Sequence, residues 1–64
     1  MNPERIRGRL VDIEVGEVPG FGCVAVGIVR VGLSHEVGLR FEAKGTDPDE
    51  ARRHLEVEIE VYFS

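Results

Sequence analysis

Hydrophobic and polar residues alternate along much of the chain, and Gly and Pro divide the pattern into four segments. Residues 5–15 alternate with period two but change phase near Leu10–Val11, which predicts a strand with a β-bulge. Residues 16–22 contain Pro19-Gly20, which suits the two central positions of a type II turn. Residues 23–31 are apolar on both parities, which predicts a strand covered on both faces. Residues 36–44 alternate cleanly and predict a half-buried strand.

The fourth segment opens with a helix start signal. Asp47 suits the N-cap, Pro48 the first helical position, and Glu50 completes a capping box. Residues 55–63 alternate between apolar and polar residues as a strand would. At helical spacing, however, one stripe is formed by Ala51, Leu55, Ile59 and Tyr62. Because no Gly, Asn or Pro lies at residues 52–54 to form a turn, we expect one helix over 48–62. The alternative is a short helix followed by a fourth, C-terminal strand.

The expected fold is therefore a single α+β domain over residues 1–64, a three-stranded antiparallel β-meander followed by one helix (β-β-β-α). One helix can cover only one face of a sheet, whereas strand 23–31 is apolar on both faces and the helix carries a second apolar strip. A second copy of the chain would cover this surface, so we expect a homodimer. The expected self-association surface is Val24, Val26, Ile28, Val57 and Val61.

Composition and charge narrow the possible partners. The chain is 42% hydrophobic and 31% charged, as expected of a folded protein. Its net charge of −4 arises entirely from residues 45–64, and an acidic balance argues against nucleic acid as the main partner. No apolar run is long enough to span a membrane, and residues 1–10 lack the apolar stretch of a signal peptide, so a cytoplasmic location is expected. Abundant charged residues with few amides are typical of a thermophilic source.

The residues that could carry chemistry are few. Cys23 has no second cysteine with which to pair, and it lies in an apolar strand, so we expect a buried core thiol. His35 and His54 lack an accompanying nucleophile or partner motif. A structural zinc site usually needs four Cys or His ligands, and the chain has three such residues in all. No catalytic residue, metal or cofactor is expected.

Three hypotheses about function follow, and the first is favoured. The favoured hypothesis is that the chain is a protein-interaction module that self-associates and has no catalytic activity. The first alternative is an RNA-binding module using Arg5, Arg7 and Arg9, which share one face of the predicted first strand. The second alternative is a small enzyme whose site forms at a subunit interface, with His35 or His54 as the base.

The helical segment also resembles a known family. Ala43-Lys44-Gly45, then Thr46-Asp47-Pro48-Asp49-Glu50-Ala51, and finally Leu55, Ile59, Glu60 and Tyr62 are similar to the last strand and helix of the HicB-like antitoxin N-terminal domain. The resemblance covers about residues 43–62. It implies a β-β-β-α fold and binding to a toxin partner or to a second copy, and it assigns no catalytic residue.

Overall fold

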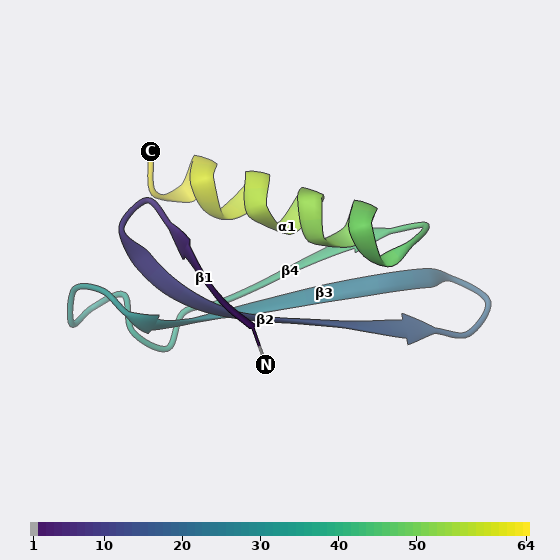
Figure 1. Cartoon of the computed structure of the whole chain (residues 1–64), viewed down its shortest axis with the longest axis horizontal. Helices are drawn as coiled ribbons and strands as arrows, with labels where there is room; N and C mark the ends of the chain where they lie inside the picture. The colour runs from purple at the N-terminus through teal and green to yellow at the C-terminus, as the bar shows by residue number, and fades with distance from the viewer. Residues whose placement is uncertain (1) are drawn as a thin grey trace.

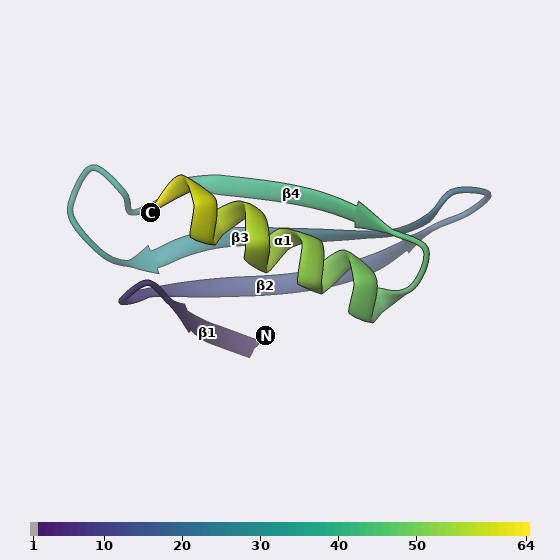
Figure 2. The ribbon, with the colours of Figure 1, turned by 90° about the horizontal axis from the view of Figure 1, so that it is seen from above.

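The computed structural model describes residues 2–64, which form one antiparallel sheet and one helix (Figure 1). The strands are β1 (Asn2–Ile6), β2 (Arg9–Val18), β3 (Gly22–Val31) and β4 (Arg40–Gly45), and they pair in chain order. The helix, α1 (Pro48–Tyr62), lies across one face of the sheet, as Figure 2 shows. The predicted α+β class and C-terminal helix are confirmed, but the prediction of three strands was wrong.

The additional strand results from a tight turn at Arg7 and Gly8. Both residues have positive φ, 50° and 82°, as in a two-residue type I′ hairpin turn. Arginine seldom adopts this conformation, so the sequence carries only half of the usual turn signal. Residues 5–15, predicted as one strand, are therefore parts of two strands that pair from Asn2↔Ile13 to Ile6↔Arg9.

The ladder has an irregularity at the level of the predicted bulge, but the extra residue is on β3 and not in residues 5–15. The ladder between β2 and β3 shifts register between Leu10 and Val11, because Leu10 pairs with Val31 and Val11 with Val29. The extra residue is Arg30, on β3. The change of phase in the sequence has a different cause: the chain reverses at residues 7–8, so that Ile6 and Val11 are both buried beneath the helix.

The turn between β2 and β3 also agrees with its prediction. The Phe21 N–H donates to the Val18 carbonyl at 3.0 Å, and Gly20 has a φ of 76°. These are the features of a type II turn with Pro19 and Gly20 at its centre. The hairpin extends past the N-terminal end of the helix, as Figure 1 shows.

The third predicted strand, residues 36–44, begins four residues late, at Arg40. Residues 36–39 belong to a loop, in which the Leu33 N–H donates to the Glu36 carboxylate at 3.0 Å. Val37, expected to point inward, is 50% exposed. Residues 36–39 therefore alternate like a strand but form a loop, in which the buried carboxylate of Glu36 binds the backbone at Leu33.

The helix begins and ends where the sequence predicted, and the alternative with a C-terminal strand is wrong. Asp47 caps it by accepting the Glu50 N–H at 2.8 Å. The Glu50 carboxylate reaches back to the Thr46 N–H at 2.6 Å, one residue earlier than in the usual capping box. Tyr62, predicted on the buried stripe, is 60% exposed and instead packs edge-on against Phe41 and Phe63.

The core lies between the helix and the inner side of the sheet. It is formed by fully buried side chains of the helix and of β2 and β3, with Leu55, Ile59, Val11 and Val29 the largest. Three inward positions of β3 carry small residues, namely Cys23, Ala25 and Gly27. At Gly27 a Cβ would lie 3.2 Å from the side chains of both Leu55 and Ile59. The helix therefore approaches β3 closely.

Candidate functional site on the open face of the sheet

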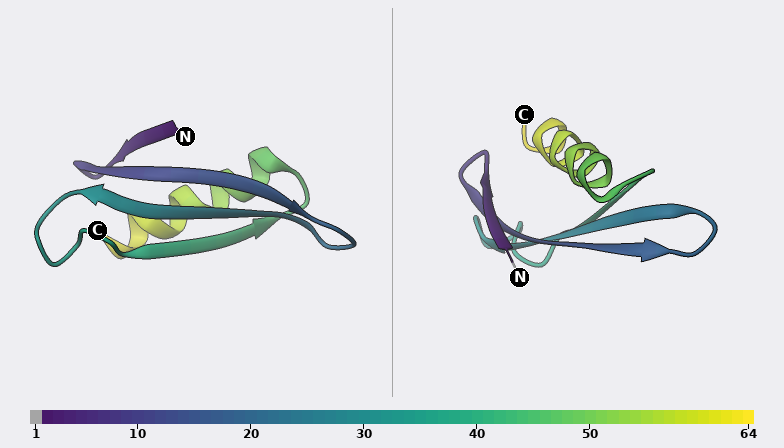
Figure 3. Two further views of the ribbon diagram at one scale, coloured as in Figure 1. Left: turned by 90° about the horizontal axis from the view of Figure 1, so that it is seen from below. Right: turned by 45° about the vertical axis from the view of Figure 1, so that its right-hand side comes forward.

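The side of the sheet away from α1, here named the open face, is formed by the outward side chains of β2, β3 and β4. No helix or strand among residues 2–64 covers it, and Figure 3 (left) views the sheet from this side. Adjacent outward positions form three rows across these strands: Asp12–Ile28–Arg40, Glu14–Val26–Glu42 and Gly16–Val24–Lys44.

An apolar stripe runs along the middle of the open face. Val24, Val26 and Ile28 are outward residues of the central strand β3 and are half-buried. Neighbouring side chains on β2 and β4 shield them in part. Within residues 2–64, α1 covers only the inward face of β3, so the predicted cover of its outward face stays a prediction.

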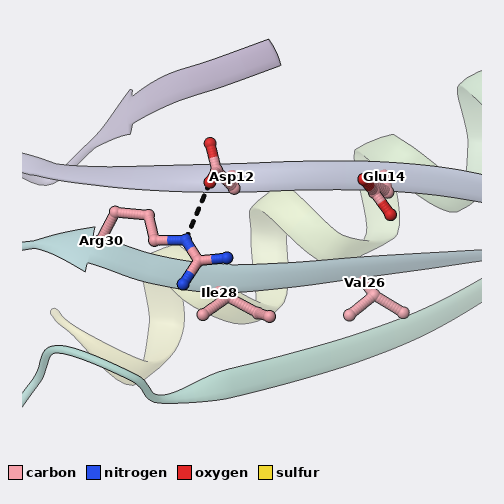
Figure 4. Close-up of a pocket in the computed structure, with 5 residues that line it drawn as sticks. All are labelled: Asp12, Glu14, Val26, Ile28 and Arg30. Carbon is pink, nitrogen blue, oxygen red and sulfur yellow. Dashed lines mark hydrogen bonds and ion pairs between the residues drawn. The ribbon is translucent and has the colours of Figure 1, made fainter. Parts of the chain in front are cut away.

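Ion pairs border the apolar stripe. Arg30, the bulged residue, donates from Nε to Asp12 Oδ2 at 2.8 Å (Figure 4). On the other flank, Arg40 Nη2 lies 3.3 Å from Glu42 Oε2. Both arginine side chains are more than half exposed, so each pair contributes little to stability. Each pair is neutral overall, so Arg30 offsets the charge of Asp12 and Arg40 offsets that of Glu42.

A shallow hollow of about 100 Å³ lies on the open face among Asp12, Glu14, Val26, Ile28 and Arg30, the residues drawn in Figure 4. Sites for small organic ligands usually enclose about 300–1,000 Å³. This hollow is much smaller than that. A neighbouring hollow of about 350 Å³ along Gly16, Val24 and Val26 reaches that range, but both hollows are open to solvent and formed by the side chains of two adjacent strands. The geometry suits contact with another surface better than enclosure of a ligand.

The predicted self-association residues lie on two opposite sides of the molecule. Val24, Val26 and Ile28 are on the open face, whereas Val57 and Val61 are on the solvent side of α1, where they are 60% and 67% exposed. A two-fold symmetric interface, in which both copies use the same patch, could use one of these sets but not both.

The three arginines predicted to share one strand face do not do so. Arg5 is on β1, Arg7 is in the turn, and Arg9 is on β2. Arg9 is bound to Glu36 and lies with its guanidinium 4.1 Å from the centre of the Phe63 ring. The expected row of arginines was wrong because the chain reverses between them; RNA contact through these residues stays a prediction.

Glu36 is a buried carboxylate that sequence reasoning left on the solvent side. Its side chain accepts two hydrogen bonds from Arg9, at 3.0 and 2.6 Å, and one from the Leu33 N–H. These donors lower the pKa of Glu36 to about 2. Its spacing gave no signal, because the partner is 27 residues away.

His35 lies beside Glu36 in a hollow at the C-terminal end of the helix. Its Nε2 atom is 4.0 Å from Glu36 Oε2, and its side chain is 76% exposed. Glu36 is already bound by Arg9 and Leu33, so it is poorly placed to act as a base or to orient the histidine. His54 is exposed on the helix, with Nδ1 2.7 Å from the Lys44 carbonyl oxygen. The structure does not bring the two histidines together at one site.

Cys23 is buried, as predicted, with 3% of its surface exposed. Burial raises the pKa of its thiol, and the nearby charges of Glu17 and Asp47 act in the same direction. A raised pKa keeps the thiol protonated and unreactive.

Comparisons with known protein families, with curated proteins and with solved structures found no match for this chain. The resemblance of residues 43–62 to the HicB-like domain stays a prediction. Within residues 2–64, no three Cys, His, Asp or Glu side chains are grouped so that they could hold a metal ion. The helix of the described chain is not long and apolar enough to cross a membrane.

Proposed function

We propose that this chain is a self-association module that forms a homodimer by packing the open faces of two sheets against each other. The observation that carries the proposal is the stripe of Val24, Val26 and Ile28 on the outer side of the central strand. Burying apolar surface is the main favourable contribution to protein association, at roughly 25 cal/mol per Å². Two sheets packed face to face form the interior of many β-sandwiches.

The size of the open face limits the strength of such a dimer. The Cα extents of the whole molecule are 38 Å along the strands and 16 Å across them, so the sheet offers at most about 600 Å² before side chains are counted. A stable dimer of standard size buries about 800 Å² on each partner. The proposed dimer is therefore of the smaller, reversible kind, which dissociates on dilution.

The solvent side of α1 is a weaker candidate for the same role. Its exposed apolar residues next to one another are Val57 and Val61, and Glu58 and His54 lie between and beside them. These two valines are individually more exposed than the stripe residues, but they lie on one convex helix, whereas the stripe lies in a sheet face that a second sheet can cover. The resemblance to the HicB-like domain implies either a toxin partner or a second copy, and the proposal takes the second copy.

Sedimentation equilibrium tests the proposal, with Val26→Lys as the disruptive variant. Val26 lies between Glu14 and Glu42, so a lysine there gains two acidic neighbours in the monomer but places a charge in the centre of the proposed interface. We expect the native chain to sediment with twice the mass of one copy, which is 7.1 kDa, and Val26→Lys to sediment as a monomer. Circular dichroism should show that the variant is still folded.

Val57→Lys is the matched control, because it introduces the same charge on the opposite side of the molecule. We expect it to leave the dimer intact. A native chain that stays monomeric at high micromolar concentration would overturn the proposal. So would a dimer that Val57→Lys dissociates and Val26→Lys does not.

A further inference from the structure

The two outer edges of the sheet differ in their capacity to pair with a further strand. β1 and β4 are the edge strands, and Figure 2 shows them on opposite sides of the sheet. The ladder between β1 and β2 alternates from the hairpin turn, so the backbone groups of Pro3 and Arg5 face the outer edge. Proline has no N–H to donate, so Pro3 interrupts the pairing of a further strand along β1.

The outer edge of β4 keeps its backbone groups free. The Val29 N–H donates to the Leu39 carbonyl at 3.0 Å, which fixes the alternation of the ladder between β3 and β4. The backbone groups of Arg40, Glu42 and Lys44 therefore point away from β3. Within residues 2–64, no strand lies beyond β4 to pair with them.

The helix closes one end of this free edge. His54 Nδ1 lies 2.7 Å from the Lys44 carbonyl oxygen, and because a carbonyl oxygen only accepts, the histidine donates. A further strand would compete with His54 for this carbonyl. The free part of the edge is therefore the segment from Arg40 to Glu42, with Phe41 at its centre.

The charges of β4 favour one self-complementary register. Two copies of β4 related by a two-fold axis run antiparallel. An axis at Arg40 or at Glu42 places that residue opposite its own copy, and like charges opposite each other destabilise a sheet. An axis at Ala43 places Glu42 opposite Lys44, whose carbonyl already accepts from the helix. An axis at Phe41 places Arg40 opposite Glu42 of the second copy, and the outward backbone groups of these two residues then meet.

The ion pair within each copy is compatible with this register. Arg40 Nη2 lies 3.3 Å from Glu42 Oε2 of the same chain. In the paired strands each arginine would lie between this glutamate and the glutamate of the second copy, so the signs alternate around the axis. On the helix side, the Phe41 rings of the two copies would meet at the axis. The exposed ring of Tyr62 packs beside Phe41, with 5.1 Å between the ring centroids.

We propose that β4 pairs with β4 of a second copy, antiparallel and with Phe41 at the two-fold axis, so that one sheet continues across two chains. This axis is perpendicular to the sheet, so the contact leaves the open face uncovered and does not depend on the proposed function. The contact is smaller than the open face, so we expect it at higher protein concentrations. The chain then carries two self-complementary surfaces.

Hydrogen exchange followed by NMR tests this contact in the variant Val24→Glu. The new carboxylate lies beside Lys44 and places a charge on the apolar stripe, which removes the open-face contact and leaves the charges at residues 40 and 42 unchanged. The amides of Arg40 and Glu42 are free in one copy and bonded in the pair. Their exchange should slow about tenfold when about nine-tenths of the chains are paired. The Phe41 amide, which bonds to β3 in every state, is the internal control.

Variants of the edge residues test the register. Glu42→Pro removes a free N–H without breaking a bond to β3, so it should abolish the protection of the Arg40 amide while circular dichroism stays native. Arg40→Glu should weaken the pairing about tenfold at low ionic strength. The exchange of the two charges, Arg40→Glu/Glu42→Arg, should restore it, because each charge again faces its opposite.

The outcomes separate this inference from the proposed function. Amide exchange at Arg40 and Glu42 that is independent of concentration up to the millimolar range would overturn the edge contact and leave the open-face dimer standing. Pairing that survives Glu42→Pro would also overturn it. A charge exchange that stays as weak as Arg40→Glu would overturn the axis at Phe41. Edge protection in a native chain that forms no open-face dimer would support the edge contact and overturn the proposed function.

Discussion

The two sides of strand β3 face different surroundings although both are apolar. The inward side carries Cys23, Ala25, Gly27 and Val29, and all four are buried. The outward side carries Val24, Val26 and Ile28, larger and half-buried. Small residues occur where the helix approaches closely, and larger ones where nothing in the described chain approaches. Residue size, in addition to hydrophobicity, therefore records which face of this strand has an intramolecular partner.

The largest difference between the two sides should appear when apolar side chains of the helix are truncated. Leu55→Ala removes a side chain with no exposed surface, and the resulting cavity should lower the free energy of unfolding by about 2–5 kcal/mol. For 64 residues, a typical total is roughly 3–10 kcal/mol, so the variant should be marginally folded. Val57→Ala, on the solvent side of the same helix, should change stability by less than about 0.5 kcal/mol. Urea unfolding at one fixed protein concentration measures both; equal losses in the two variants would contradict the assignment of the helix faces.

A pair of glycines sharpens the comparison within the sheet. A Cβ at Gly27 would lie 3.1 Å from Val11 Cγ1 and 3.2 Å from Leu55 and Ile59 atoms, so Gly27→Ala should cost about 1–3 kcal/mol through overpacking. A Cβ at Gly16 would meet no atom within 4 Å, and Gly16→Ala should be neutral or slightly stabilising. Thermal melts of the two variants report the difference. A Gly27→Ala protein as stable as the native chain would show that the helix does not pack so closely.

The pH dependence of stability should reveal the buried carboxylate beside the covered face. The pKa of Glu36 is about 2 in the folded chain because Arg9 and the Leu33 N–H bind its charged form, against 4.5 for a free side chain. A lowered pKa contributes stability that is present above pH 4.5 and is lost as the pH falls towards 2. Glu36→Gln should therefore melt at a lower temperature than the native chain at neutral pH, and the gap should close in acid. Glu42→Gln, in an exposed ion pair, is the control and should change the curve little; a gap that stays constant with pH would count against this role.

The smallest effect is expected at the margin of the covered face, where β1 meets the helix. Arg52 lies 2.8 Å from Glu4 Oε1 and 3.6 Å from Glu56 Oε2. The pKa of Glu56 is raised to about 7, first by its hydrogen bond to Glu4 and then by burial. A raised pKa contributes stability that is present below 4.5 and is lost as the pH rises through 7. Glu56→Gln keeps the hydrogen bond without the titration, so it should melt slightly above the native chain in mild alkali and alongside it in mild acid. A melting temperature of Glu56→Gln below that of the native chain in mild alkali would contradict a protonated Glu56 that is hydrogen-bonded to Glu4.

Local chemistry allowed part of this fold to be predicted. The cap at Asp47, the turn at Pro19-Gly20 and the buried stripe of the helix depend on neighbours in the sequence. The cap and the turn were confirmed, and so was the stripe except for Tyr62, which is exposed. The hairpin at Arg7-Gly8 was missed, because arginine in a left-handed conformation gives no sequence signal. The loop held by Glu36 was missed for a different reason, since the ion pair that forms it joins residues far apart in the chain.

The candidate surface was predicted with the same limits. The apolar parity of residues 24, 26 and 28 was visible in the sequence, as was the second strip at residues 57 and 61. That these two sets lie on opposite sides of the molecule depends on where the helix packs, which only the three-dimensional arrangement reveals. The separation of Arg5, Arg7 and Arg9 likewise follows from the missed hairpin.

The most direct measurement of the central claim is the response of individual methyl groups to dilution, followed by NMR. If two open faces pack together, the methyl signals of Val24, Val26 and Ile28 should shift as the protein is diluted through the dissociation constant, while those of Leu55, Ile59, Val57 and Val61 stay in place. Signals that are independent of concentration over the whole range, or shifts confined to Val57 and Val61, would contradict the account.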